Sequence, residues 1–184
     1  MVATGEKELI LSLQNPLERE AAFGRLVIQY QKVLYYHIRR LVLLHEDADD
    51  VLQNTFLKVW RNLDSFRGDA AIKTWLYRIA TNEALSFIAQ KKRRATDGIE
   101  SLENDLGHSM NQGRDVSGEE IQHKLQRAVE TLPERQRLVF NMRYYDDMRY
   151  EEMSDVLGVT EGALKASYHH AVKKIESYLT GIHP

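Results

Sequence analysis

Cysteine is absent from this 184-residue sequence, and proline occurs only 3 times. Without a thiol the chain has no disulfide and no thiolate metal site, which is compatible with a reducing compartment. The few prolines and the 10 glycines leave room for long helices. Hydrophobic residues at 43% and charged residues at 28% are typical of a folded, globular chain and exclude wholesale disorder.

Long hydrophobic segments are also missing. Residues 41–44 form an apolar run far too short to cross a bilayer, and residues 1–10 lack the apolar core of a signal peptide. No phosphate-binding loop, nucleophile–base arrangement or metal-ligand spacing stands out. We therefore expect a soluble, cytoplasmic protein without membrane insertion. It should not be an enzyme, and it should use no cofactor, metal or small-molecule substrate.

The net charge of −2 hides an uneven distribution along the chain. Residues 1–96 carry a net charge of +4, residues 97–120 carry −6, and the positive and negative charges of residues 121–184 cancel. The acidic segment is rich in Gly, Ser, Asn and Asp, a composition typical of a flexible linker. We therefore predict two domains, residues 1–96 and 119–184, joined by a flexible acidic linker at residues 97–118.

Apolar residues recur at spacings of three and four in both domains, which predicts an all-α fold. We expect four helices in the first domain and four in the second. They should lie near residues 7–13, 17–44, 46–63, 71–92, 120–131, 133–142, 150–157 and 161–175. On the fourth helix, Trp75 is expected in the core, whereas Tyr77, Arg78 and Asn82 are expected at the surface.

Residues 150–174 have the spacing of a helix-turn-helix motif. A short helix ends at Gly158, which tolerates the left-handed conformation, and Thr160 is a natural N-cap for the next helix. The second helix of such a motif can enter the major groove of DNA. An ordinary helical hairpin with a solvated polar face is the alternative.

Two further surfaces have a structural and a functional interpretation. Residues 91–94, Lys-Lys-Arg-Arg, stabilise the C-terminus of a helix electrostatically but also form a patch for phosphates. With Arg78 and Asn82 upstream, they suit single-stranded nucleic acid. The acidic and polar face at residues 47–58 is either a solvated helix face or a surface for docking another protein.

Three blocks of sequence resemble the extracytoplasmic-function (ECF) sigma factors. They are DDVLQNTFLKVW at residues 49–60, IKTWLYRIATN at residues 72–82, and LPERQRLVF at residues 132–140 with YEEM at 150–153 and GALKAS at 162–167. Each block is moderately specific, and the three in this order are highly specific. The resemblance spans nearly the whole chain except the linker, with no domain between the two helical ones.

The resemblance implies a role for each block in transcription initiation. The first block would dock on the core RNA polymerase, through Asp49, Asp50, Gln53, Asn54 and Phe56. The second block, with the loop before it and the basic run after it, would recognise and melt the minus-ten element, through Ser65, Phe66, Arg67, Gly68, Asp69, Arg78, Asn82, Lys91, Lys92, Arg93 and Arg94. The third would read the minus-thirty-five element, through Thr160, Glu161, Gly162, Lys165, Ala166, Ser167, His169, His170 and Lys173.

The sequence departs from the family pattern at several positions. Asn54 replaces a frequent Glu, and Ser86 replaces a frequent Asp. Arg149 stands where Ser or Thr often caps a helix, so that helix start is expected to be less well capped. Tyr168 replaces a common Arg, which removes one expected phosphate contact.

The partners implied are the clamp and flap of the large polymerase subunits, duplex promoter DNA and its melted non-template strand, and an anti-sigma factor. A stand-alone helix-turn-helix regulator is the alternative, but it leaves Asn82 and residues 91–94 unexplained. A helical interaction protein without DNA affinity is a second alternative. Binding to duplex DNA without polymerase, and its salt dependence, separate these hypotheses.

Overall fold

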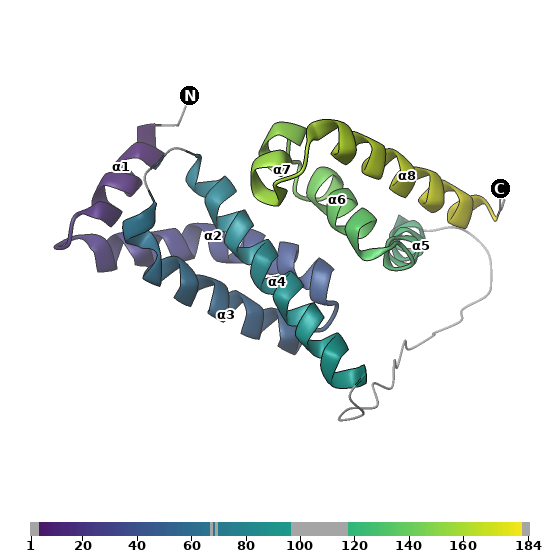
Figure 1. The fold of residues 1–184 in the computed structure, drawn as a ribbon, viewed down its shortest axis with the longest axis horizontal. Helices are drawn as coiled ribbons and strands as arrows, with labels where there is room; N and C mark the ends of the chain where they lie inside the picture. The colour runs from purple at the N-terminus through teal and green to yellow at the C-terminus, as the bar shows by residue number, and fades with distance from the viewer. Residues whose placement is uncertain (1–3, 67, 69, 97–117, 182–184) are drawn as a thin grey trace.

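The computed structural model describes residues 4–66, 68, 70–96 and 118–181, and every regular element among them is helical (Figure 1). The elements are α1 (Thr4–Gln14), α2 (Arg19–Val42), α3 (His45–Arg61), the short 3-10 helix η1 (Leu63–Ser65), α4 (Ile72–Thr96), α5 (Gly118–Glu130), α6 (Glu134–Tyr144), α7 (Tyr150–Leu157) and α8 (Glu161–Thr180). The all-α prediction is confirmed. The predicted linker lies outside the described residues, apart from Gly118, where α5 begins.

The first half of the molecule is built around α2, which packs against α1, α3 and α4. Its apolar stripe is fully buried at Leu26, Leu34 and Ile38, as the three- and four-residue spacing predicts. Val59 of α3 and Leu76 of α4 complete the same core and are equally inaccessible to water. Burial of these aliphatic side chains is the main force that holds the four helices together.

Backbone turns fall where the sequence places small residues. Gly68, between η1 and α4, has a φ of 78°, and Gly158, after α7, has a φ of 65°. Both values lie in the left-handed region, which glycine enters without the steric cost of a Cβ atom. Leu43 adopts the same conformation at the end of α2 with a φ of 69°, and its backbone N–H donates to the Arg39 carbonyl. A non-glycine helix end of this kind has no clear signal in the sequence.

The second half contains α5 to α8, with the helix-turn-helix formed by α7 and α8. It has a small core of its own between α5, α6 and α8. This cluster consists of Ala128, Val129, Leu132, Phe140, Ala171 and Ile175. Ala171 and Ile175 therefore lie on the inner face of the last helix.

The two halves contact each other along a seam, where α4 packs against α7 and α2 packs against α6 (Figure 1). Leu138, Met142, Met153 and Leu164 of the second half belong to the same continuous apolar cluster as the core of the first half. Sequence alone left this arrangement open. Within the described ranges, none of the helices is both long and apolar enough to span a membrane.

Candidate nucleic-acid and polymerase interfaces

Helix α3 presents the acidic and polar face that the sequence predicts. Asp49, Asp50, Gln53 and Asn54 are all exposed on this helix. The Asp49 carboxylate lies 3.5 Å from the imidazole of His45 one turn earlier, between Oδ2 and Nδ1. Phe56 behaves differently, because it is half-buried and meets Phe23 edge to face, with ring centroids 6.3 Å apart. Four of the five residues therefore face solvent, and Phe56 supports the helix by packing.

A shallow groove of about 270 Å3 separates α3 from α4. Asn54 lines it from α3, while Ser86, Gln90 and Arg93 line it from α4. The carboxylate of Glu83, which pairs with Lys58, also lines the groove from α4, so the groove offers hydrogen bonds together with charges of both signs. Both family departures on these two helices, Asn54 and Ser86, meet here.

The segment between η1 and α4 begins with a buried anchor. Phe66 is only 7% exposed, and its ring lies 4.7 Å from that of Trp75 between centroids. The prediction that Trp75 belongs to the core is thereby confirmed. Ser65 is exposed and donates to the carbonyl of Asn62 at 2.7 Å. Arg67 and Asp69 lie outside the described residues.

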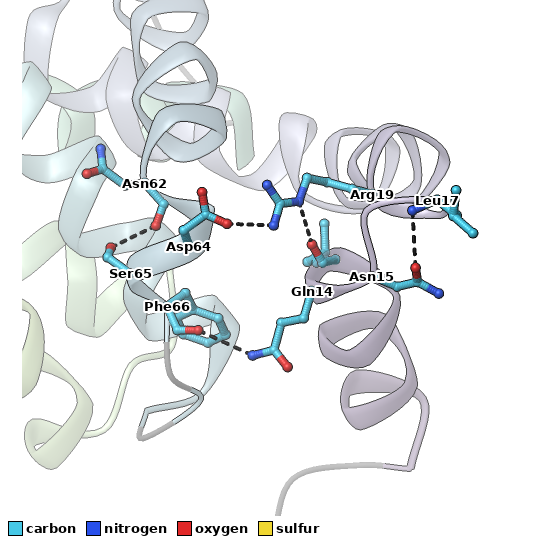
Figure 2. Close-up of polar contacts among 9 residues, drawn as sticks. Gln14, Asn15, Leu17, Arg19, Asn62, Asp64, Ser65 and Phe66 are labelled. Atoms are coloured by element: carbon cyan, nitrogen blue, oxygen red, sulfur yellow. Dashed lines mark hydrogen bonds and ion pairs between the residues drawn. The ribbon is translucent and has the colours of Figure 1, made fainter.

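Helix α1 holds this segment from outside, a contact that sequence reasoning missed (Figure 2). Gln14 donates to the Phe66 carbonyl at 3.5 Å, and the Arg19 guanidinium pairs with Asp64 at 2.5 Å. The same Arg19 donates from Nε to the Leu13 carbonyl at the end of α1. These side chains tie the 3-10 helix to the corner between α1 and α2.

The far end of the same segment is tied down by Glu6. Its carboxylate accepts a 2.7 Å hydrogen bond from the backbone N–H of Ile72, the first residue of α4. An N–H in the first turn of a helix has no partner within the helix, so a carboxylate there satisfies it and favours the positive end of the helix dipole. Glu6 and Ile72 are 66 residues apart, and no local sequence motif points to such a contact.

Helix α4 carries the candidate residues for single-stranded DNA. Arg78 and Asn82 are exposed, as predicted. Of the basic run, Lys91 pairs with Asp47 of α3 at 2.8 Å and Lys92 pairs with Glu134 of α6. Arg93 and Arg94 are exposed. Two cations of the run thus also brace neighbouring helices.

The prediction that Tyr77 lies at the surface is wrong, because the side chain is only 2% exposed. Its ring meets His37 of α2 at 4.9 Å between centroids. Burial, together with the negative charge of Asp146 in the second half, raises the pKa of the Tyr77 phenol. The sequence of the first domain alone could not reveal this neighbour, since Asp146 follows 69 positions later.

The helix-turn-helix has the local geometry that the sequence predicts. Thr160 is the N-cap of α8, and its hydroxyl accepts from the backbone N–H of Ala163 at 3.4 Å. The candidate residues for the minus-thirty-five element all come from α8 and its cap, and each is exposed except the half-buried Ser167. They are Thr160, Glu161, Gly162, Lys165, Ala166, Ser167, His169, His170 and Lys173. Lys165 pairs with Glu161 at 3.0 Å on this face.

Two departures from the family pattern have structural compensation. Arg149 offers no side-chain acceptor, but the Glu152 carboxylate accepts from the Arg149 backbone N–H at 2.8 Å and caps the start of α7. The N-cap residue itself therefore provides no side-chain cap, as expected, and Glu152 supplies one hydrogen bond at this helix start. Tyr168 is half-buried and stacks on Phe140 at 5.8 Å, and burial raises the pKa of its phenol. It joins α8 to α6 by packing.

No grouping of three or more His, Asp or Glu side chains suited to a metal ion occurs in residues 4–66, 68, 70–96 and 118–181. The exposed faces of α3, α4 and α8 offer amides, cations, carboxylates and imidazoles in separate patches. Such groups bind phosphates, base edges and other proteins.

Two known families match this chain, one in each half. The Sigma-70 region 2 family matches residues 26–94, and the Sigma-70 region 4 family matches residues 122–175. The ECF RNA polymerase sigma-E factor of Escherichia coli (strain K12) is 32% identical over 166 residues, which cover 86% of each chain. The RNA polymerase sigma-H factor of Pseudomonas aeruginosa is 31% identical over 182 residues, covering 95% of this chain and 93% of that one.

Two solved structures share the fold. CnrH, determined in complex with the cytosolic domain of CnrY, matches with a TM-score of 0.67 and 23% identity, over 95% of this chain and 98% of that one. The sigma factor RpoE, determined in complex with the anti-sigma factor NepR from Bartonella quintana, matches with a TM-score of 0.71 and 21% identity, over 88% and 98%. At such identities the likeness concerns the fold.

Proposed function

The chain belongs to the ECF sigma factors, which direct RNA polymerase to promoters, and we propose that its three exposed faces divide this work between them. Residues 1–96 form the domain that binds core polymerase and opens the minus-ten element. Residues 119–184 form the domain that reads the minus-thirty-five element, and residues 97–118 connect them. The observation that carries the assignment is the capped helix α8, which exposes its polar face at the position of a recognition helix.

Helix α3 is the proposed docking surface for the clamp of the large polymerase subunit. Asp50, Gln53 and Asn54 offer acceptors and donors on one exposed face. Asp49 adds to this face. Phe56 supports the helix because it packs on Phe23. A second contact, between the flap of the polymerase and the second domain, follows from the family assignment.

The segment from Ser65 to α4 is the proposed site of promoter melting. Extruding a base from the duplex costs a few kcal/mol, so a rigid rim and contacts to the backbone must offset this cost. Anchors at both ends, Phe66 on Trp75 and Ile72 on Glu6, supply the rigid rim. Asn82 would hold the base by its amide, while Arg78 and residues 91–94 would contact phosphates of the melted strand.

Helix α8 is the proposed reader of the minus-thirty-five element. Glu161, close to its N-terminus, can accept from a cytosine amino group, and His169 can address base edges about two turns further on. Lys165 and Lys173 are exposed cations at the right spacing for phosphates. The pairing of Lys165 with Glu161 in the free protein implies that DNA binding rearranges this pair.

The chain acts without chemistry of its own in this proposal. It lends recognition to the polymerase, and it works in the cytoplasm, where the polymerase and the chromosome are. An anti-sigma factor is the proposed negative regulator. This proposal draws on the neighbour RpoE, whose structure contains the anti-sigma factor NepR, and on CnrH, which was determined with the cytosolic domain of CnrY.

Run-off transcription tests the function directly. Purified core RNA polymerase is incubated with genomic DNA fragments in the presence and absence of this protein. New transcripts with discrete start sites are expected only when the protein is present, and the start sites reveal both promoter elements. If no transcripts appear and no complex with core polymerase forms, while the protein alone binds duplex DNA, it is a stand-alone regulator instead.

Substitutions on the three faces separate the three roles. Gln53→Arg should lower affinity for core polymerase, whereas the matched change Gln29→Arg on the exposed face of α2 should not. Asn82→Ala should leave core binding intact and slow strand opening, followed by permanganate reactivity of unpaired thymines. Lys165→Ala should weaken binding to all duplexes similarly and lower the salt dependence by about one phosphate contact.

A further inference from the structure

A buried carboxylate joins the two halves of the molecule. Asp146, between α6 and α7, accepts from His37 of α2, with Oδ2 2.7 Å from Nδ1, and its other oxygen pairs with Arg40. The side chains of His37 and Asp146 are 0% and 3% exposed. The second ring nitrogen of His37 lies 2.9 Å from the hydroxyl of Thr81. We call His37, Arg40 and Asp146 the latch.

Helix α6 also completes the end of α2. Carbonyl groups in the last turn of a helix have no partner within the helix. Asn141 donates to the carbonyl of Arg40 and Arg137 donates to that of Leu41, each at 3.4 Å. Burial lowers the pKa of the Arg137 guanidinium. Polar groups of the first half that would otherwise need water are thus satisfied by the second half.

The seam combines buried apolar contacts, which include Met142, Met153 and Leu164, with an edge that is open to solvent. A groove of about 490 Å3 runs along the seam between Leu85 of α4 and Leu138, Leu157 and Ala163 of the second half. Together with the charged latch, this groove gives the seam the character of a separable interface between domains.

The closed arrangement covers part of the DNA-binding motif. The first helix of a helix-turn-helix crosses the DNA backbone while the second enters the major groove. Here the first helix, α7, packs on α4 of the other half. Ser167, a candidate contact to the minus-thirty-five element, lines the same groove as Leu85. The first half therefore occupies space next to the recognition helix that promoter DNA would need.

We propose that the latch holds the free protein in a closed, self-inhibited form, which must open before the second domain reads duplex DNA. This proposal rests on the proposed function, since it assigns the second domain to the minus-thirty-five element. The Asp146 carboxylate is the centre of the latch because it contacts both His37 and Arg40 across the seam. Asp146 is a positioning residue, and it touches no DNA.

The chemistry of the latch suits reversible opening. Desolvation offsets much of the attraction within a buried ion pair, so the pair adds little net stability, yet removal of one partner is costly because a charge stays buried without compensation. Separation of the two halves removes this free-energy cost, because Arg40 and His37 are then hydrated. Neutralising Asp146 should therefore shift the protein from closed to open by a large factor, while each half keeps its own core.

Distance measurements on the full chain test the closed form. The sequence has no cysteine, so cysteines introduced at the exposed positions Gln29 and Lys174 accept two spin labels without background. Asp146→Asn removes the charge with almost no change in volume. Asp147→Asn is the matched control, because the Asp147 side chain is 96% exposed and lies next in the sequence. Circular dichroism verifies that both variants fold.

One narrow distance distribution is expected for the parent protein and for Asp147→Asn. Asp146→Asn should show a broad distribution at longer distances, with the ratio of open to closed molecules raised roughly tenfold or more. Arg40→Gln, which breaks the latch from the other side, should act in the same direction. Distributions of both latch variants that match the parent protein would overturn the latch.

Binding to DNA tests the inhibition separately. A duplex carrying the upstream element found by run-off transcription is titrated with each protein in the absence of polymerase. Asp146→Asn should bind it several-fold more tightly than the parent protein or Asp147→Asn. Equal binding by an opened variant would overturn self-inhibition. If the parent protein directs no transcription with core polymerase while Asp146→Asn still opens, the proposed function fails and the latch stands.

Discussion

The core of the first half and the contact between His37 and Asp146 at the seam are both shielded from water, but their chemistry differs. Leu26 and Leu34 on α2 are fully buried among aliphatic side chains. His37 and Arg40 lie on the same helix, within two turns after Leu34. Both contact the carboxylate of Asp146 in the second half. Apolar burial stabilises the fold, whereas a paired charge chiefly fixes which surfaces meet. One helix thus serves folding at its middle and domain arrangement at its end.

The largest expected effect on stability comes from a cavity in the apolar core of the first half. Leu26→Ala should lower the free energy of unfolding by about 2–5 kcal/mol, because it removes apolar contacts and leaves a cavity in a site that is fully buried. Chemical denaturation followed by circular dichroism measures the change. Leu57→Ala, at a position 48% exposed on α3, is the control and should change the free energy by about 0.5 kcal/mol or less.

Alkaline pH should lower the stability of the folded protein through the buried Tyr77 phenol. The pKa of Tyr77 is raised by burial and by Asp146, so above about pH 10 the unfolded chain loses this proton while the folded protein keeps it. The folded state then binds more protons, and stability falls as the pH rises. Below that pH the contribution is fully present.

Tyr77→Phe should therefore make the decline in the denaturation midpoint above about pH 10 shallower than in the parent protein. Tyr36→Phe removes a phenol that is 50% exposed on α2 and serves as the control. A decline of the same slope in the parent protein and in Tyr77→Phe would show that folding does not raise the pKa of Tyr77.

The sequence predicts contacts that recur with helical period and misses those that join distant elements. The spacing of Leu26, Leu34 and Ile38 was enough to place the core face of α2, and Gly158 with Thr160 was enough to place the turn before α8. Tyr77 was placed wrongly because its neighbours His37 of α2 and Asp146 of the second half are distant from it in sequence. Local pattern carries no information on such a neighbour.

The candidate site divides in the same way. Exposure of Asp50, Asn82 and Lys165 follows from their position opposite the apolar stripe of each helix. The hydrogen bond from Ile72 to Glu6 could not be foreseen, since a carboxylate at residue 6 has many equally suitable helix ends to approach. Sequence thus indicates which side chains are available for binding, and the three-dimensional structure reveals what holds them in place.

A smaller effect concerns the support of the melting segment, which lies away from the seam. Glu6→Ala should reduce stability by about 1 kcal/mol, as loss of a helix-capping acceptor does. It should also slow strand opening at the minus-ten element, measured by permanganate reactivity, without changing affinity for core polymerase. Glu6→Gln, whose amide oxygen still accepts from Ile72, should restore opening. Glu8→Ala, at an exposed position of α1, is the matched control.

A failure of Glu6→Gln to restore opening would mean that the negative charge at the start of α4, rather than the hydrogen bond, positions the segment. If instead Glu6→Ala and Glu8→Ala open promoters at the rate of the parent protein, α1 has no part in melting. The two outcomes separate a contact that holds the chain from one that acts through the helix dipole.

The smallest expected effect sharpens the comparison within the seam itself. Lys92 and Glu134 form a second ion pair across it, but their side chains are 66% and 37% exposed. Exposed pairs contribute little and are screened by salt, so Glu134→Gln should raise the open population only about twofold at low salt and not at all in about 1 M salt. The opening caused by Asp146→Asn should persist at both concentrations, because the side chains of His37 and Asp146 are buried. Spin-label distances in Glu134→Gln, Lys92→Gln and the double variant measure the coupling of the pair. If Glu134→Gln raised the open population as much as Asp146→Asn does, the exposed pair Lys92–Glu134 would be as important for the closed form as the latch.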